Sequence, residues 1–352
     1  MKILTVVGAR PQFIKAAAVS NILRKEHEEI LIHTGQHYDK NMSNIFFEEL
    51  QIPKPDYNLE IGSGNHGEQT GKMLIELEKI YLKEKPDLVL VYGDTNSTLA
   101  GALCASKLLI PVAHVEAGLR SFNNAMPEEQ NRILTDHISE ILFVPTTTAE
   151  KNLKNEGVTK GVHNVGDVMF DAVLHFKKLS QEKSNILEKI GLKSDEFILT
   201  TIHRAENTND KNRLKNIVEA LNESGEKIVL PLHPRTKKYV EDYGLKFGKN
   251  IMILEAVGYL DMISLEMHAK KIVTDSGGVQ KEAFFMGKPC ITIRDETEWV
   301  ETVEIGWNKV VGTDKKKITD AILFFEPKSE QQNIFGDGKA GEKILNIINS
   351  IF

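Results

Sequence analysis

Short apolar runs alternate with longer amphipathic stretches through the first half of the chain. Uninterrupted apolar runs predict strands at 3–7, 30–32, 88–92, 111–115 and 140–144. Between them, apolar residues recur at helical spacing, as in the run Thr70, Met73, Leu74, Leu77, Ile80 and Tyr81. Runs of about five apolar residues suit strands that are buried on both faces. The alternation therefore predicts a parallel, doubly wound α/β sheet.

The alternation pauses once and then starts again. Residues 175–196 are rich in Lys, Ser, Glu and Gln, and strands are predicted afterwards at 197–202, 227–230, 251–254, 271–274 and 289–293. We therefore expect an N-terminal α/β domain over 1–170 and a C-terminal α/β domain over 171–340. The last residues carry an apolar stripe that includes Ile344 and Ile348, so a helix over 341–352 is expected to pack back onto the first domain.

Composition removes several classes of function. The chain of 352 residues has a net charge of −6 and no long basic run, which argues against nucleic acid as a partner. Two cysteines, Cys104 and Cys290, lie in core-like runs, so we expect reduced thiols and a cytoplasmic protein rather than a disulfide framework. No apolar run approaches the roughly 18 residues that a membrane helix needs.

Polar residues follow the predicted strands at six places. These polar residues lie in the segments Gly8-Ala9-Arg10-Pro11, Gly93-Asp94-Thr95, His114-Val115-Glu116, His203-Arg204-Ala205-Glu206, His233-Pro234-Arg235 and Asp275-Ser276-Gly277-Gly278. Ligands of parallel sheets bind outside the carboxyl ends of the strands. We therefore expect two polar rims, one from each domain, that face one cleft.

The segment from Asp275 to Glu282 is the clearest phosphate signal. Ser276, Gly277 and Gly278 stand between a strand and a helix, where backbone N–H groups can approach an anion. Glu282 lies further along that helix and could accept two ribose hydroxyls. The alternative is an ordinary helix cap followed by a solvated glutamate.

Arg10 and Lys15 could add positive charge opposite a diphosphate, or could be a surface pair on an amphipathic helix.

The spacings of a dinucleotide loop, a P-loop, a paired-cysteine zinc site and a metalloprotease helix are all absent. His33 and His37 have a metal-ligand spacing, but Gly35 between them favours a loop. We therefore expect neither a metal nor a cofactor.

Three acids are candidates for proton transfer. Asp94 could instead cap the next helix, and Glu128 could be a first-turn acid after Pro127. Glu116 is harder to explain, because burial in its apolar surroundings is unfavourable without a partner. Carboxylates that crowd one site shift each other's pKa values, which can produce both an acid and a base.

Six segments together resemble one enzyme family. They occur in the order found in the non-hydrolysing UDP-N-acetylglucosamine 2-epimerases: Gly8-Ala9-Arg10-Pro11, Gly93-Asp94-Thr95, His114-Val115-Glu116-Ala117-Gly118-Leu119-Arg120, Pro127-Glu128-Glu129-Gln130-Asn131-Arg132, His203-Arg204-Ala205-Glu206-Asn207 and Thr274-Asp275-Ser276-Gly277-Gly278-Val279-Gln280. The resemblance covers nearly the whole chain. It implies two Rossmann-like domains of the glycosyltransferase-B type, a homodimer, and interconversion of UDP-GlcNAc and UDP-ManNAc without NAD or metal.

The resemblance also implies roles for single residues. The catalytic residues would be Asp94, Glu116, Glu128 and His203, and the UDP contacts would be Arg10, Lys15, His203, Ser276, Gly277, Gly278 and Glu282. A second UDP-GlcNAc activates bacterial members, and the residues similar to that site are Gln36, His37, Gln69, Arg204 and His233. The implied reaction eliminates UDP to leave a glycal and then adds UDP back with the opposite configuration at C2.

Two features depart from the bacterial pattern. The stretch from Arg120 to Pro127 is shorter, and Trp299 stands where many bacterial members have Arg, which bears on the sugar accepted. Four alternatives stay open: an epimerase of a related UDP-N-acetyl sugar, a hydrolysing epimerase, a metal-independent glycosyltransferase and a non-catalytic UDP-sugar sensor.

Overall fold

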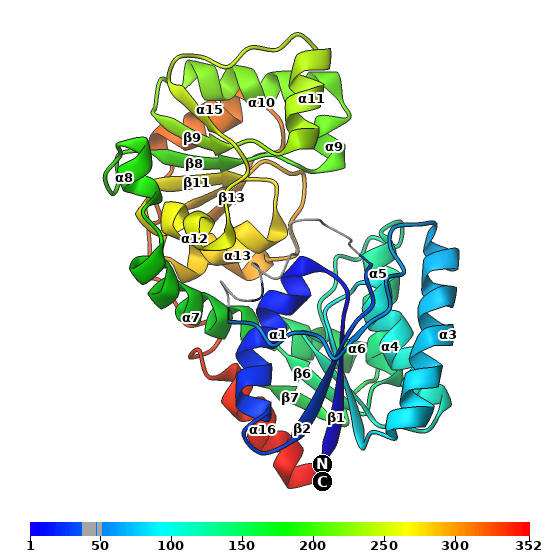
Figure 1. Ribbon diagram of the computed structural model, residues 1–352. Coiled ribbons are helices and arrows are strands. Elements are labelled where there is room, and N and C mark those ends of the chain that lie inside the picture. Colours follow the sequence, from blue (N-terminus) through cyan, green and yellow to red (C-terminus); the bar gives the residue numbers. More distant parts are fainter. Residues whose placement is uncertain (37–46, 48–50) are drawn as a thin grey trace. The chain divides into compact units, whose positions relative to one another are not determined.

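The computed structural model describes residues 1–36, 47 and 51–352 and divides the chain into two units (Figure 1). The N-terminal unit comprises Met1–His175 and Asn333–Phe352, and the C-terminal unit comprises Phe176–Gln332. The boundaries fall at 175/176 and 332/333, whereas the sequence pattern suggested 170/171 and 340/341.

The N-terminal unit is built on a seven-stranded sheet with the order β3-β2-β1-β4-β5-β6-β7. Every pair of neighbouring strands in it is parallel. The strands are β1 (Lys2–Val7), β2 (Glu28–His33), β3 (Tyr57–Asn58), β4 (Leu88–Tyr92), β5 (Val112–Val115), β6 (Ile141–Val144) and β7 (Val162–Asn164). The order reverses direction between β1 and β4, which is where open α/β sheets bind their ligands.

Helices connect these parallel strands. They are α1 (Arg10–Leu23), α3 (His66–Glu84), α4 (Asn96–Lys107), α5 (Pro127–Ile138) and α6 (Thr147–Asn155). The chain returns to this unit in α16 (Ala340–Ile351), which lies beside α1 (Figure 1). Ile344 and Ile348 of α16 are fully buried, so the apolar stripe at the end of the chain packs inside the N-terminal unit.

The C-terminal unit repeats the architecture with six parallel strands in the order β10-β9-β8-β11-β12-β13. The strands are β8 (Ile198–Thr201), β9 (Ile228–Pro231), β10 (Ile251–Leu254), β11 (Lys271–Thr274), β12 (Cys290–Thr292) and β13 (Asn308–Val310). The helices are α8 (Ile186–Ile190), α9 (Ala205–Thr208), α10 (Lys211–Glu223), α11 (Pro234–Asp242), α12 (Tyr259–His268), α13 (Gly277–Phe285), α14 (Val300–Glu304) and α15 (Lys315–Phe324). The predicted α/β fold with parallel sheets is confirmed.

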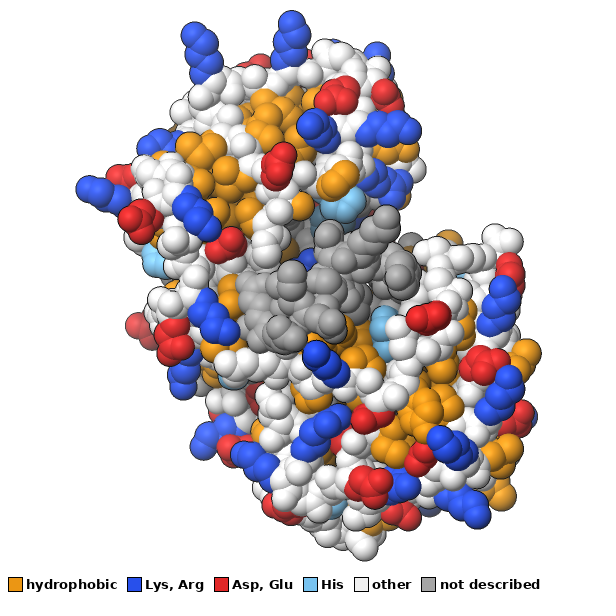
Figure 2. Space-filling model, viewed as in Figure 1, with side chains coloured by type: hydrophobic (Ala, Val, Ile, Leu, Met, Phe, Trp, Pro, Cys, Tyr) orange, Lys and Arg blue, Asp and Glu red, His pale blue; other side chains and the backbone are white. Residues whose placement is uncertain are grey.

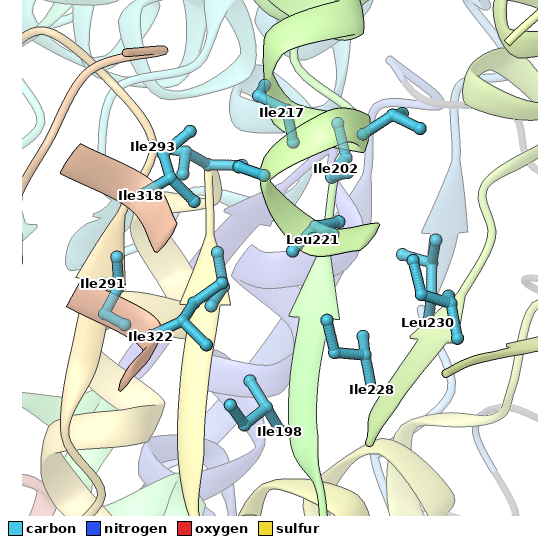
Figure 3. Packing of buried hydrophobic residues seen from close by; sticks show 14 of the residues in the cluster. Ile198, Ile202, Ile217, Leu221, Ile228, Leu230, Ile291, Ile293, Ile318 and Ile322 are labelled. Carbon is cyan, nitrogen blue, oxygen red and sulfur yellow. The ribbon is translucent and has the colours of Figure 1, made fainter. Parts of the chain in front are cut away.

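One core of the C-terminal unit lies between its sheet and two helices. Ile198, Ile228 and Ile291 come from the strands, Ile217 and Leu221 from α10, and Ile318 and Ile322 from α15 (Figure 3). The seven side chains are 0–1% exposed. Branched aliphatic side chains suit this contact because they fill the space between the pleated strands and the helix ridges.

The stretch where the sequence pattern paused is largely helical. Helix α7 (Val168–Lys183) runs across the unit boundary, and α8 follows it directly. Within α7, Ala172, Val173 and Phe176 are buried. The pause in the strand–helix alternation thus corresponds to helices, which one buried apolar face is enough to hold in place.

The predictions from composition concern the surface charges and the cysteine thiols. Lys and Arg side chains are interspersed with Asp and Glu on the face in Figure 2, in keeping with the absence of a basic run. Both cysteines are buried and free, as expected. Among the described residues, no helix is long and apolar enough to cross a membrane.

Candidate active site

Glu116 and Lys15 form a buried ion pair at the carboxyl ends of β5 and β1. Glu116 Oε2 contacts Lys15 Nζ, and the two side chains are 6% and 14% exposed. The pair supplies the partner that burial of Glu116 requires. Glu116 also has a φ of 73°, a left-handed conformation that costs a residue with a Cβ free energy. Such strain persists where the surroundings enforce it, often at functional sites.

Asp94 follows β4 and is held by helix α5. Arg132 Nη2 lies 2.7 Å from Asp94 Oδ2, and Asn131 Nδ2 donates to the Asp94 carbonyl oxygen at 2.9 Å. The alternative role for Asp94 as a helix cap was wrong, because the N-cap of α4 is Thr95. Asp94 therefore presents a partly exposed carboxylate that an arginine orients.

Helix α5 carries two adjacent acids in different environments. Pro127 is the first helical residue, as the sequence indicated, and Glu128 is exposed on the first turn. Glu129 is 1% exposed. Its carboxylate accepts hydrogen bonds from the Ser121 and Phe122 amides and pairs with Arg132. Glu129 thus has a structural role, and Glu128 is available to solvent.

A second buried network supports the ends of β4 and β5. His114 Nδ1 lies 2.7 Å from Asp136 Oδ1, and its Nε2 lies 2.7 Å from the Gly93 carbonyl oxygen. Arg120 Nη1 donates to Asp136 Oδ2 at 2.7 Å. Burial alone would raise the pKa of Asp136, but its partners His114 and Arg120 outweigh burial, so this pKa is lowered. An ionised Asp136 therefore fixes the Gly93 turn that precedes Asp94.

In the C-terminal unit, Asp275 organises the turn after β8. Its fully buried carboxylate accepts from the His203 amide at 3.1 Å, the Arg204 amide at 3.1 Å and Asn207 Nδ2 at 3.1 Å. His203 Nδ1 lies 3.4 Å from Asp275 Oδ1, and the His203 side chain is 45% exposed. The strand-end signal had pointed to His203, whereas the organising role of Asp275 depends on contacts that the sequence does not display.

The glycine segment begins helix α13 as predicted. Ser276 is its N-cap, and its Oγ accepts from the Val279 amide at 3.4 Å. A Cβ at Gly277 would collide with the Glu298 carboxylate, so a larger residue here would have to displace that side chain. Burial alone would raise the pKa of Glu298, but nearby Arg294 outweighs burial and the pKa is lowered. A negative group thus already lies beside the positive end of α13.

Glu282 lies in a buried polar cluster on α13. Tyr259 Oη donates to Glu282 Oε1 at 2.8 Å. Glu266 of α12 faces the same carboxyl and is fully buried. Glu266 was not among the predicted site residues. The signal for it in the sequence is an acid three residues after Ile263, on the buried face of an apolar helix.

The residues similar to an activator site fall in both units. In the N-terminal unit, Gln36 Oε1 accepts from Ser97 Oγ at 2.6 Å, and Gln69 Nε2 donates to the Gly62 carbonyl oxygen at 2.7 Å. In the C-terminal unit, His233 is the N-cap of α11, and its ring centroid lies 6.2 Å from that of His203, next to Arg204. His37 lies outside the described residues.

Within the described ranges, no group of three or more His, Cys, Asp or Glu side chains could hold a metal ion. His33 is the buried last residue of β2, and its Nδ1 accepts from the Gly35 amide at 3.2 Å, just after the strand ends.

Comparison with known proteins identifies the family. Residues 21–349 match the family model described as UDP-N-acetylglucosamine 2-epimerase. The chain belongs to the UDP-N-acetylglucosamine 2-epimerase family. A UDP-N-acetylglucosamine 2-epimerase homolog of Methanococcus maripaludis is 59% identical, with 100% of both chains covered. The UDP-2,3-diacetamido-2,3-dideoxy-D-glucuronate 2-epimerase of Pseudomonas aeruginosa is 55% identical, with 99% of both chains covered.

A solved structure of this family has the same fold. The Methanocaldococcus jannaschii UDP-GlcNAc 2-epimerase, in complex with UDP-GlcNAc and UDP, matches with a TM-score of 0.91 at 50% identity. The match covers 99% of this chain and 100% of that one. The two-domain fold of the glycosyltransferase-B type, expected from the resemblance, is thereby confirmed.

Proposed function

We propose that this epimerase-family protein interconverts UDP-GlcNAc and UDP-ManNAc by inverting the configuration at C2. The observation that carries the proposal is the gathering of Asp94 and Glu116 at neighbouring strand ends, each bound to a buried cation. Such positioned carboxylates suit proton transfer at a carbon atom. The solved relative with bound UDP-GlcNAc and UDP supports the choice of substrate.

The proposed route is elimination followed by re-addition. The C2 proton is not next to a carbonyl group, so direct abstraction is very unfavourable. Departure of UDP from C1 develops positive charge there and acidifies the C2 proton. A carboxylate takes that proton as the C1–O bond breaks, which leaves a glycal with a C1–C2 double bond and bound UDP. A proton then adds to the other face of C2, and UDP adds back to C1.

The residues divide the work between acid–base chemistry and UDP retention. Asp94, Glu116 and Glu128 are the proposed proton carriers. Ser276, Gly277 and Gly278 at the start of α13 favour the diphosphate, Glu282 accepts the ribose hydroxyls, and Arg10, Lys15 and His203 stabilise charge on the departing phosphate. Elimination and re-addition together involve no net oxidation or reduction, so we expect turnover without added NAD. Because none of the proposed steps uses a metal, we also expect turnover in EDTA.

The decisive experiment follows UDP-GlcNAc alone in D₂O by NMR. We expect UDP-ManNAc with deuterium at C2. Free ManNAc with UDP would instead identify a hydrolysing enzyme, and reaction only after addition of an acceptor would identify a glycosyltransferase. Binding without turnover would identify a sensor. Product that keeps hydrogen at C2 would contradict elimination.

A second substrate has specific support. The Pseudomonas aeruginosa relative is named as a UDP-2,3-diacetamido-2,3-dideoxy-D-glucuronate 2-epimerase. Trp299 stands where we expected many bacterial members to have Arg, and this difference bears on the sugar accepted. Trp299 is 5% exposed, and Lys281 Nζ lies 4.1 Å from the centre of its ring, which supports a packing role. Comparing kcat/KM for UDP-GlcNAc and for that glucuronate decides between the two sugars.

We further propose a cytoplasmic homodimer that UDP-GlcNAc activates through Gln36, His37, Gln69, Arg204 and His233. Buried free thiols support a reducing compartment. Light scattering should give twice the chain mass of 39.5 kDa. Initial rates should rise sigmoidally with UDP-GlcNAc and become hyperbolic in Gln69→Ala, whereas hyperbolic wild-type rates would contradict activation.

A further inference from the structure

His66 is an exposed histidine that the proposed reaction does not use. It is the first residue of α3, and its Nδ1 atom lies 3.1 Å from Asn96 Nδ2. Asn96 is 6% exposed and begins α4, two residues after the candidate catalytic acid Asp94. The imidazole ring is therefore held on one side by the buried polar groups that surround the end of β4.

The carbonyl group of Asp94 determines which atom of Asn96 faces the ring. A carbonyl oxygen can only accept, so the Asn131 atom that lies 2.9 Å from it must be the amide nitrogen Nδ2. The same Nδ2 atom lies 3.1 Å from Asn96 and needs an acceptor there, which is Oδ1. The amide nitrogen of Asn96 is therefore the atom that faces His66.

Gln69 gives the same orientation from the other side. Its Nε2 atom donates to the Gly62 carbonyl oxygen at 2.7 Å, so its Oε1 atom is the one that faces Asn96. Asn96 Nδ2 donates to that oxygen at 2.9 Å. Two backbone carbonyl groups thus assign the Asn96 amide independently, and they agree.

This orientation determines the tautomer of His66. Asn96 Nδ2 is a donor, so His66 Nδ1 must accept and carries no proton. The proton of the ring then lies on the other nitrogen, Nε2. Among the described residues, the ring has no hydrogen bond besides the one from Asn96. His66 therefore presents a neutral Nε2–H donor at the exposed edge of a ring whose other side is fixed.

We propose that His66 is a substrate-binding residue, whose Nε2–H donates a hydrogen bond to an oxygen of the sugar in UDP-GlcNAc, and that Asn96 is its positioning residue. This inference rests on the proposed function. Asn131 Nδ2 bonds both Asn96 and the Asp94 carbonyl group, so the donor of His66 and the proposed proton carrier are fixed by one shared amide. A neutral N–H group suits an uncharged hydroxyl or acetamido oxygen, and the diphosphate has charged partners in the proposed mechanism.

The test compares UDP-GlcNAc with UDP by calorimetry in the full-length protein. His66→Phe keeps an aromatic ring and removes both nitrogens, and His66→Gln keeps an N–H donor of similar reach. We expect His66→Phe to weaken UDP-GlcNAc binding about tenfold and UDP binding less than about twofold, because UDP lacks the sugar. His66→Gln should bind UDP-GlcNAc within about threefold of wild type. His163→Phe on the edge strand β7 is the control and should leave both affinities unchanged.

The outcomes separate this contact from the proposed function. Equal losses for both ligands in His66→Phe would show a structural role only, and unchanged binding of UDP-GlcNAc would also overturn the proposal. If the wild-type protein binds UDP-GlcNAc without converting it, the proposed function fails, while a selective loss in His66→Phe still supports the contact.

The tautomer is tested without any ligand. In NMR of the free protein labelled with ¹⁵N-histidine, the signals of His66 are those that disappear in His66→Gln. We expect them to show the proton on Nε2, and a proton on Nδ1 would overturn the proposal.

Discussion

Arg132 joins a candidate catalytic acid to a structural one. Its Nη2 atom lies 2.7 Å from Asp94 Oδ2, while its Nη1 atom pairs with Glu129 Oε2. The guanidinium plane therefore couples the end of β4 to the loop that Glu129 holds. Lysine has a single ammonium group and cannot reproduce two bonds in this fixed geometry.

We accordingly predict that Arg132→Lys lowers kcat about 10- to 100-fold, because it displaces Asp94 from its reacting position. UDP affinity should stay within about twofold, because Arg132 is not a proposed UDP contact. Arg24→Lys is the matched control, since Arg24 Nε pairs with Glu29 Oε2 at 2.7 Å in the same unit. Equal kcat values in the two variants would refute the positioning role.

Glu128 and Glu129 should respond in opposite ways to the same substitution. We expect Glu128→Gln to lose about 10²- to 10⁴-fold in kcat with unchanged stability, because it removes an exposed proton carrier. Glu129→Gln should lower the free energy of unfolding by about 3–5 kcal/mol, because it leaves the buried Arg132 partly uncompensated. Urea unfolding and turnover per folded molecule measure the two effects. A stable, active Glu128→Gln variant would remove Glu128 from the mechanism.

The left-handed conformation of Glu116 can be tested by stability alone. Gly tolerates a φ of 73° and Ala does not, so Glu116→Gly should be more stable than Glu116→Ala by about 1 kcal/mol. Both variants leave Lys15 without this carboxylate, and we expect neither to turn over substrate. Equal unfolding free energies would mean that the backbone at this position is not strained.

Glu266 should make the folded state less stable as the pH rises. Its raised pKa means that the folded protein keeps a proton that the unfolded chain releases above the ordinary value of 4.5. Relative to Glu266→Gln, the wild-type free energy of unfolding should therefore fall by about 1.4 kcal/mol per pH unit from that value up to the folded pKa. Urea unfolding of both proteins at about pH 5, 6 and 7 measures the difference. Parallel curves would mean that Glu266 ionises normally in the fold.

Local pattern was sufficient for several strands. The predicted bounds 88–92 and 271–274 coincide with the central strands β4 and β11, and the bounds 251–254 coincide with the edge strand β10. Continuous apolar runs mark central strands such as β4 and β11 because both faces of a parallel sheet are covered. The edge strands β3, β7 and β13 have two or three residues each, which is too few for a pattern, so the apolar runs did not predict them.

The sequence by itself determined the α/β class, the strand ends that carry the polar residues and, through six ordered segments, the family. These properties depend on neighbours along the chain. Only the tertiary structure decided which charges meet: Lys15 with Glu116 across 101 residues, and Arg132 with Asp94 across 38. It also distinguished Glu128 from Glu129 and brought Glu266 against Glu282. Burial and pairing depend on the packing of elements that are distant in the sequence. The identity of an acidic residue in the sequence does not reveal whether water, an arginine or another acid faces its carboxylate.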